Sequence, residues 1–128
     1  WGRIINISSV SVKTPVNGLF LSNSLRMGVL GWAKALSDEV APFGITVNTV
    51  CPGTTKTERI EEILTAQSKS TGKDKKDLED AIAKNIPLQR IGEATDLSAL
   101  ITFLASEKAN YMTGLAVQVD GGSARTFY

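Results

Sequence analysis

The chain has 128 residues, of which 42% are apolar and 21% charged, and its formal net charge is +1. This length and composition are typical of one globular domain with a single core. The nearly neutral charge gives no reason to expect nucleic acid or an anionic membrane surface as a partner. No apolar run approaches the roughly 20 residues of a spanning helix, so no membrane segment is predicted.

Histidine is absent, and Cys51 is the single cysteine. This excludes Ser-His-Asp and Cys-His catalysis and the usual zinc ligand sets, so no metal site is predicted. Cys51 cannot form an internal disulfide, and no basic and apolar leader opens the sequence, so the cytoplasm is the expected compartment. Because the chain opens on Trp1 rather than methionine, with a strand almost at once, we expect a fragment of a longer protein.

The first predicted element is a strand from Arg3 to Ser8, in which isoleucines form a nearly continuous apolar run. Such a run is typical of a strand buried on both faces of a parallel sheet. Ser8 and Ser9 end this strand. The carboxyl ends of strands in an open α/β sheet are where ligands bind, although an isolated pair of serines more often simply begins a turn.

A helix is predicted from Leu21 to about Ala41, and Gly44 supplies its stop. Apolar residues recur along it at steps of three and four. This stripe comprises Leu21, Leu25, Val29, Trp32, Leu36 and Val40. Gly28 and Gly31 each cost about 1 kcal/mol relative to alanine inside a helix, so a close neighbour is expected against that face. Trp32 is predicted to be a core residue or a subunit contact.

A second short strand is predicted from Ile45 to Val50, and a threonine-rich loop then leads into a helix after Thr57. Residues 68–77 are polar and charge-dense, which predicts a mobile connection before a shorter helix around Leu78. Thr95 is the predicted cap of a further helix. Residues 114–119 enter the last strand.

The predicted order of elements is βαβααβ. Strands that alternate with helices indicate parallel pairing through right-handed crossovers, with the three strands side by side and helices on the faces. The predicted fold class is therefore α/β, with the chain forming half of a doubly wound parallel sheet.

Five segments stand in the order and spacing of the short-chain dehydrogenase/reductase family, which the chain resembles nearly from end to end. They are Gly2 to Ser9, Gly44 to Asn48 with Pro52, Gly53 and Thr57, Arg90 to Gly92, Phe103 to Ser106, and Tyr111 to Gly114 through Asp120 to Gly122. The resemblance covers the second half of such an enzyme. It implies that residues 1–128 are a single partial domain, the C-terminal half of a Rossmann-type dinucleotide-binding domain.

The resemblance also implies partners and a cofactor. The expected cofactor is NAD or NADP, and the expected substrate is a small carbonyl or alcohol. The choice between the two nucleotides depends on the N-terminal half of the domain, which is the other expected partner. A homodimer or homotetramer is implied, with the long helix paired against its copy. The charged segment 68–77 lies where a lid covers the substrate in the family.

The resemblance assigns roles to particular residues. Ser9 would hydrogen-bond the reacting oxygen, and Pro52, Gly53, Thr55 and Thr57 would line the nicotinamide end of the cofactor. Thr57 could hold the carboxamide group and also cap the helix that follows. Cys51 beside Pro52 is interpreted as a small buried side chain without a chemical role.

The long helix aligns with the family without a gap only if Ser22 takes the place of the catalytic tyrosine and Arg26 that of the lysine. In the family, the phenol is the acid or base, and the ammonium lowers its pKa and holds the ribose. A serine hydroxyl is far less acidic, and a guanidinium does not give up a proton. Arg26 could still hold ribose or phosphate.

Two hypotheses follow from the changed pair. One is a divergent oxidoreductase in which another group carries the proton, with Lys13 as a candidate, although an ordinary exposed loop lysine is the commoner case. The other is a non-catalytic nucleotide-binding or regulatory protein on the same scaffold. In addition, if the chain folds alone, the strand from Arg3 to Ser8 would have an open edge that we expect a partner segment to cover.

Overall fold

The computed structural model describes residues 1–126. In chain order the elements are β1 (Gly2–Ile7), the short 3-10 helix η1 (Val10–Val12), α1 (Phe20–Val40), η2 (Ala41–Phe43), β2 (Ile45–Pro52), α2 (Glu58–Thr71), α3 (Lys75–Lys84), α4 (Ala94–Ala105), η3 (Glu107–Ala109) and β3 (Ala116–Val119). Three α-helices thus lie between β2 and β3, at the three places where the sequence predicts helices, although the summary order βαβααβ counts only two of them. No helix within residues 1–126 is long and apolar enough to cross a bilayer.

The three strands form one parallel sheet in the order β1-β2-β3, as predicted. The central strand β2 pairs with both neighbours, with Val47 opposite Ile4 and Thr49 opposite Ala116. Residues 46–51 of β2 are all buried. The sheet therefore has its best-protected backbone in the strand that leads directly to the Pro52-Gly53 turn.

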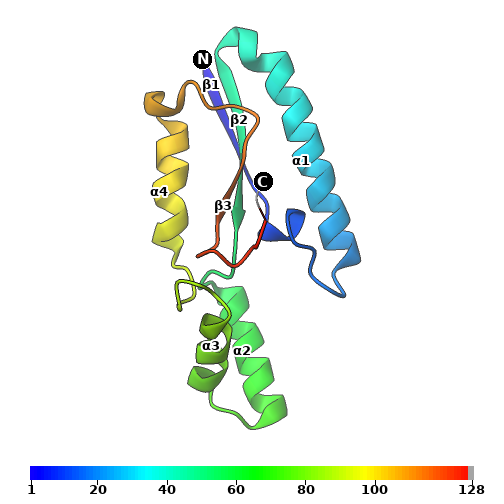
Figure 1. Cartoon of the computed structure of the whole chain (residues 1–128), viewed down its shortest axis with the longest axis vertical. Coiled ribbons are helices and arrows are strands. Elements are labelled where there is room, and N and C mark those ends of the chain that lie inside the picture. The colour runs from blue at the N-terminus through cyan, green and yellow to red at the C-terminus, as the bar shows by residue number, and fades with distance from the viewer. Residues whose placement is uncertain (127–128) are drawn as a thin grey trace.

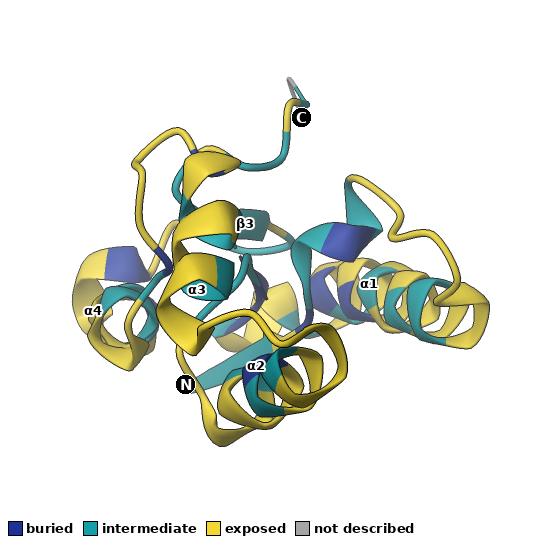
Figure 2. Cartoon of the chain, turned by 90° about the horizontal axis from the view of Figure 1, so that it is seen from below, coloured by how far each residue is buried: buried dark blue, intermediate teal, exposed yellow. Residues whose placement is uncertain are grey.

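The helices α1 and α4 cover opposite faces of this sheet (Figure 1, Figure 2). Val50 packs against Leu104 of α4, whereas Val47, three residues earlier, faces the space beneath α1. Both crossovers step across the sheet in the same direction but over opposite faces, so they have opposite hands. In Figure 2 the crossover through α1 is right-handed and that through α4 is left-handed. The prediction of right-handed crossovers throughout is wrong for the second.

β1 is an edge strand in residues 1–126, not the doubly buried strand that its sequence predicts. Its residues are only half-buried up to Asn6, and Ile7 is 54% exposed. The physical reason is that β2 is the one strand that pairs with β1 in this part of the chain. The apolar run thus lies along an open edge, which is a surface that pairs readily with another strand.

The apolar stripe of α1 faces outward. Leu21 is 80% exposed and Trp32 is 55% exposed, whereas Ala33 and Ser37 on the adjacent face are buried against the sheet. The helix itself is confirmed, but Trp32 is not a core residue. Figure 2 shows the exposed side of α1 pointing away from the sheet.

The two glycines of α1 also lie on open surface. A Cβ atom at Gly28 or Gly31 would meet no other atom within 4 Å. The close neighbour that these glycines predict is therefore absent from residues 1–126. Gly44, in contrast, ends η2 as expected, with a left-handed backbone at φ 71°.

Residues 68–77 are mostly helical and do not form the predicted mobile connection. Residues 68–71 complete α2, and residues 75–77 begin α3. Gly72 ends α2 with φ 71°, and the Asp74 carboxylate accepts a hydrogen bond from the Lys76 N–H at 2.7 Å. The charged residues therefore belong to a tight helical hairpin, α2–α3, which projects beyond the carboxyl ends of the strands (Figure 1).

The helix α4 is capped by Glu93. The sequence pattern predicts Thr95 as the cap, so that prediction is wrong. The Glu93 N–H donates to the Asp96 carboxylate at 2.7 Å, which forms one half of a capping box. Arg90 holds the same carboxylate through two hydrogen bonds of 2.6 and 2.9 Å. The Arg90 guanidinium, together with the Glu93 N–H, lowers the pKa of Asp96 from 3.8 to about 2.

We expect Asp96→Asn to make the protein less sensitive to acid. Because the pKa of Asp96 is lower in the folded than in the unfolded chain, its stabilisation is present above about pH 4 and is lost as the pH falls towards about 2. Urea unfolding midpoints measured at a series of pH values test this. Asp80→Asn, at an exposed carboxylate on α3, is the control. Equal acid sensitivity of the wild type and Asp96→Asn would contradict the assignment.

Candidate functional site

Arg26 ties α1 to the end of β1. Its Nε donates a hydrogen bond to Ser22 Oγ at 3.1 Å, and its Nη1 donates to the Ser8 carbonyl oxygen at 2.8 Å. Ser22 and Arg26 lie one turn apart on the same face of α1, and both are half-buried. The structure therefore brings this pair to the carboxyl end of β1, next to Ser9.

Two serine hydroxyls at this edge accept hydrogen bonds and retain their own hydrogens. Ser9 Oγ accepts from the Ser11 N–H at 3.1 Å and thereby caps η1. Ser22 Oγ accepts from Arg26. Neither hydroxyl donates to a protein group within residues 1–126. An N–H that donates to a hydroxyl oxygen strengthens the donor character of that hydroxyl, so Ser9 and Ser22 are suited to hydrogen-bond an acceptor atom.

Several buried polar atoms near this edge lack a partner within residues 1–126. Those on β1, β2, η1 and the residue directly after β1 are Asn6 Nδ2, Ser8 Oγ, Ser11 Oγ and Thr49 Oγ1. Asn6 and Thr49 are directly opposite each other in the β1–β2 register. Groups of this kind are normally satisfied by water, by a ligand or by a further segment of protein.

The loop after β2 carries most of the predicted cofactor residues. A Cβ atom on Gly53 would lie 2.7 Å from Asp120 Cβ, so only glycine lets this turn pass the end of β3. The Thr55 hydroxyl donates to the Gly53 carbonyl at 3.3 Å. Thr57 Oγ1 accepts from the Ile60 N–H at 3.5 Å, which confirms Thr57 as the cap of α2.

The same loop is fastened to the α2–α3 hairpin and to the start of α4. The Lys56 N–H donates to the Gly92 carbonyl at 2.8 Å. The Lys56 ammonium lies 3.1 Å from both the Glu79 carboxylate of α3 and the Glu93 carboxylate, and these two groups raise the pKa of Lys56. Pro52 ends β2 opposite Val119. The loop thus has a fixed position relative to α3, the start of α4 and the end of β3.

A cavity of about 310 Å³ opens between this loop, the start of α4 and the end of β3. Thr55 is the predicted site residue that lines it. Its charged groups are already paired, because Arg90 binds Asp96 and the Asp120 carboxylate accepts backbone N–H groups. Ser9, Ser22 and Arg26 do not line this cavity. The cavity therefore contributes no further charged group to the site formed by Ser9, Ser22 and Arg26.

Cys51 is fully buried, and burial raises the pKa of its thiol, although the Lys13 charge and the Ser9 N–H oppose this shift. The interpretation as a small buried side chain is confirmed. Lys13 faces a different cavity beneath α1 and forms no hydrogen bond with Ser22 in the described part of the chain. No group of three potential metal ligands occurs within residues 1–126.

A family model for enoyl-(acyl carrier protein) reductases matches residues 1–124. The 3-oxoacyl-[acyl-carrier-protein] reductase FabG of Haemophilus influenzae is 41% identical over 122 residues. The chain belongs to the short-chain dehydrogenase/reductase family. The match to FabG covers 95% of this chain but 46% of FabG. The chain thus spans about half the length of the curated relatives that it matches.

Solved structures of short-chain reductases share the fold. YwfH, described as an NADPH-dependent reductase involved in bacilysin biosynthesis, superposes with a TM-score of 0.91 at 35% identity, covering 99% of this chain and 48% of YwfH. A Pseudomonas aeruginosa short-chain oxidoreductase with NADPH bound, described as containing an atypical catalytic center, gives 0.83 at 26% identity and covers 97% and 46%. These similarities confirm the α/β parallel sheet of the Rossmann type, and the chain covers about half of each of these structures.

Sequence reasoning missed two contacts at this end of the short-chain reductase fold. One is the hydrogen bond from Arg26 to the Ser8 carbonyl, because a backbone acceptor leaves no pattern in the sequence. The other is the Lys56 bridge to Glu79 and Glu93, whose members are too far apart in sequence to share a helical spacing. Only the Lys56 bridge had a signal in the sequence, because Lys56 is a single positive charge within the threonine-rich loop and could be expected to pair with a carboxylate.

Proposed function

We propose that the full-length protein is an NAD(P)-dependent oxidoreductase that reduces the carbonyl group of a small molecule. Residues 1–128 would form the second half of its dinucleotide-binding domain, and the cytoplasm remains the expected compartment. The observation that carries the proposal is the position of Arg26, which links Ser22 to the strand end beside Ser9. The similarity to FabG and to the NADPH-dependent YwfH supports it.

The residues present fit the nicotinamide end of such a cofactor. Pro52 and Gly53 are half-buried at the carboxyl edge of the sheet. Because Gly53 has no side chain, this turn packs closely against Asp120. The Thr57 hydroxyl accepts from the helix backbone and keeps its hydrogen for a carboxamide. Arg26 has further N–H groups that could hold ribose or phosphate. Bound here, the cofactor would supply the hydride.

In this proposal, Ser9 and Ser22 donate hydrogen bonds to the carbonyl oxygen as negative charge develops on it. The fixed positive charge of Arg26 behind Ser22 stabilises the same oxygen. Preorganised donors of this type contribute about 10²- to 10³-fold each to kcat. Neither serine nor arginine readily gives up a proton at neutral pH, so the oxygen takes its proton from water and leaves a hydroxide ion.

We expect Ser9→Ala to lower kcat for carbonyl reduction by about 10²- to 10³-fold while the affinity for NADPH stays the same. Nicotinamide absorbance followed with the full-length protein against a panel of ketones and aldehydes measures this. Ser24→Ala, at an exposed serine of α1, is the control. Oxidation of the product alcohols should be much slower, because no group at the edge is a good base near neutral pH. A wild-type rate that does not depend on Ser9 would contradict the proposal.

The second candidate function is a non-catalytic nucleotide-binding or regulatory protein. The observation that favours it is the absence of a phenol and an ammonium at positions 22 and 26. NADPH binding by the full-length protein, without turnover of any carbonyl or alcohol in the panel, would support this candidate over the first.

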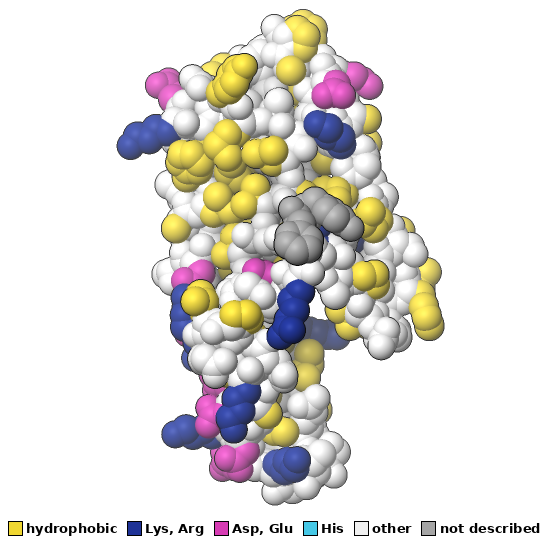
Figure 3. All heavy atoms as spheres, in the orientation of Figure 1, with side chains coloured by type: hydrophobic (Ala, Val, Ile, Leu, Met, Phe, Trp, Pro, Cys, Tyr) yellow, Lys and Arg dark blue, Asp and Glu magenta, His cyan; other side chains and the backbone are white. Residues whose placement is uncertain are grey.

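We further propose that the full-length protein forms a homodimer through α1. Leu25 is 70% exposed and Val29 and Trp32 about half exposed along one stripe, and Gly28 beside them leaves open space for a second helix. In Figure 3 some of the exposed apolar side chains lie along the edge of the molecule that α1 forms. Contiguous apolar surface of this kind marks a protein interface, and a stripe along one long helix is complementary to its own copy.

A further inference from the structure

A second cavity, of about 410 Å³, lies beneath α1 on the side of β3. Its walls are largely aliphatic. They are formed by Leu30, Ala33, Val47, Leu115 and Ala116. Ser9, Ser22, Arg26 and the predicted cofactor residues do not line it, whereas Lys13, the candidate proton carrier of the sequence analysis, does.

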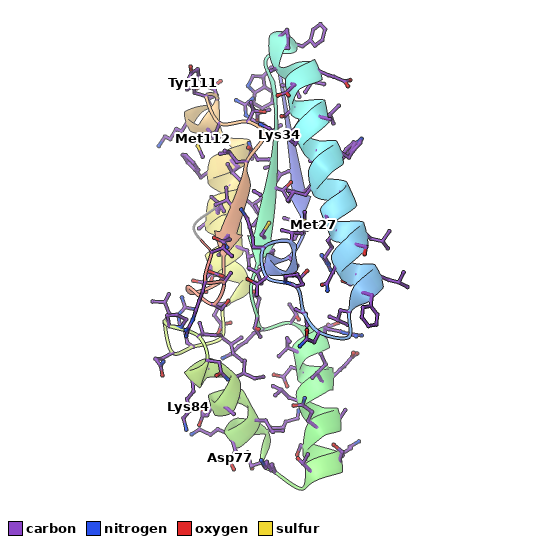
Figure 4. The ribbon with its side chains drawn as sticks, turned by 45° about the vertical axis from the view of Figure 1, so that its right-hand side comes forward. Met27, Lys34, Asp77, Lys84, Tyr111 and Met112 are labelled. Carbon is purple, nitrogen blue, oxygen red and sulfur yellow. The ribbon has the colours of Figure 1, made fainter. Side chains whose placement is uncertain are left out.

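Two lysines, Lys13 and Lys34, line this cavity. Within the described part of the chain neither ammonium group is engaged in an ion pair or a hydrogen bond. The Lys34 Nζ lies 2.7 Å from the position that a Cβ atom on Gly114 would occupy, so the Lys34 side chain packs directly against the backbone that leads into β3. Figure 4 shows Lys34 between α1 and the strands. Two uncompensated positive charges on one cavity attract an anion.

The cavity also contains an unsatisfied buried hydroxyl. Thr49 is 1% exposed and lines the cavity, and its Oγ1 has no hydrogen-bond partner within residues 1–126. A buried hydroxyl without a partner is destabilising, so such groups normally bind water or a ligand. Thr49 is on the central strand, beneath α1 and away from the open edge of β1, so a strand added to that edge would not reach it.

We propose that this cavity binds a small aliphatic carboxylate. The carboxylate oxygens accept hydrogen bonds from Lys13, Lys34 and the Thr49 hydroxyl, and the alkyl chain packs against Leu30 and Val47. A bare inorganic anion would leave the apolar walls empty, and a neutral alcohol would leave the two ammonium groups unpaired. The cavity therefore selects a molecule that carries both features.

The experiment is a calorimetric titration of the full-length protein with acetate, butyrate and hexanoate at low ionic strength. Affinity should rise with chain length, by up to about fourfold for each methylene that enters the cavity. Hexan-1-ol and inorganic phosphate should bind far more weakly than hexanoate. The Lys13→Met, Lys34→Met and Thr49→Val variants should each weaken hexanoate binding, the lysine variants by about tenfold.

Two further variants separate loss of binding from loss of folding. Lys34→Arg keeps the charge and should keep most of the affinity, and Lys108→Met, on the distant η3, should leave it unchanged. The Ser9→Ala variant should bind hexanoate normally even if carbonyl reduction is never found, which separates this site from the proposed activity. No hexanoate binding, equal binding of hexan-1-ol, or unchanged affinity in any one of the Lys13→Met, Lys34→Met and Thr49→Val variants would overturn the proposal.

Discussion

Replacing Ser22 by tyrosine and Arg26 by lysine together should raise kcat for carbonyl reduction by about 10²- to 10⁴-fold. The natural pair offers hydrogen-bond donors and a fixed positive charge, but no group that gives up a proton near neutral pH. A phenol at position 22, with its pKa lowered by a neighbouring ammonium, supplies that proton directly. Steady-state reduction rates of the full-length protein with NADPH measure the gain.

The single variants and a matched control locate the source of this gain. Ser22→Tyr alone should give a large part of the increase, because Arg26 keeps its positive charge near the new phenol. Arg26→Lys alone should give little, because it loses the hydrogen bond to the Ser8 carbonyl and leaves no phenol at position 22 whose pKa the ammonium could lower. Ser24→Tyr, at an exposed position of the same helix, should leave the rate unchanged. A double variant slower than the wild type would mean that Ser22 and Arg26 are themselves the working pair.

Trp32→Glu should dissociate the proposed homodimer, with at least about a 30-fold increase in the dimer dissociation constant. Trp32 is 55% exposed in the isolated chain, and burial of a carboxylate in an apolar interface is costly unless it is paired. Sedimentation of the full-length protein over a range of concentrations measures the change. The affinity for NADPH should be retained, since Trp32 lies on the outward face of α1.

The matched control for this prediction is Tyr111→Glu. Tyr111 is fully exposed, like the most open residues of α1, but it lies on the opposite side of the sheet from that helix (Figure 4). This variant makes the same change from an aromatic to a carboxylate and should leave the dimer intact. If both variants sediment like the wild type, α1 is not the interface.

The long helix shows how far sequence periodicity reaches. Steps of three and four predicted α1 to within one residue at each end, because a helix of this length repeats its pattern several times. Periodicity did not reveal which face is buried. The sheet receives small side chains such as Ala33 and Ser37, while Leu25 and Trp32 face outward. An apolar stripe that is exposed in the single chain has the same three- and four-residue spacing as a stripe that is buried in a core, so the spacing alone does not tell them apart.

The errors at other elements have local physical causes. Residues 68–77 are charged because both helices of the α2–α3 hairpin are exposed, and charge density alone does not distinguish a solvated helix from a coil. Thr95 is a good capping residue, yet Glu93 caps α4 because Arg90 fixes the Asp96 carboxylate at the helix start. An ion pair with a residue that precedes the helix, six positions before Asp96, thus overrides the capping preference of a single residue.

The candidate site was predictable as a set of positions but not as a geometry. The order of motifs placed Ser9, Ser22 and Arg26 together, and the structure brings Arg26 within hydrogen-bond distance of Ser22 and of the Ser8 carbonyl. The hand of the crossover through α4 could not be predicted, because the general rule favours the opposite hand. The cavity bounded by Lys13, Lys34 and Thr49 depends on that three-dimensional arrangement, and no sequence spacing indicates it.

The opposite hands of the two crossovers have a consequence for how such proteins diversify. Since α1 and α4 already cover both faces of the three strands in residues 1–126, this unit has its own outer layers, and β1 offers an edge at which a further strand can pair. Any chain ending in a compatible parallel strand could be joined there without new helices to cover the junction. The unit therefore has the architecture of an exchangeable cassette, which gene fusion or recombination could combine with different nucleotide-binding halves.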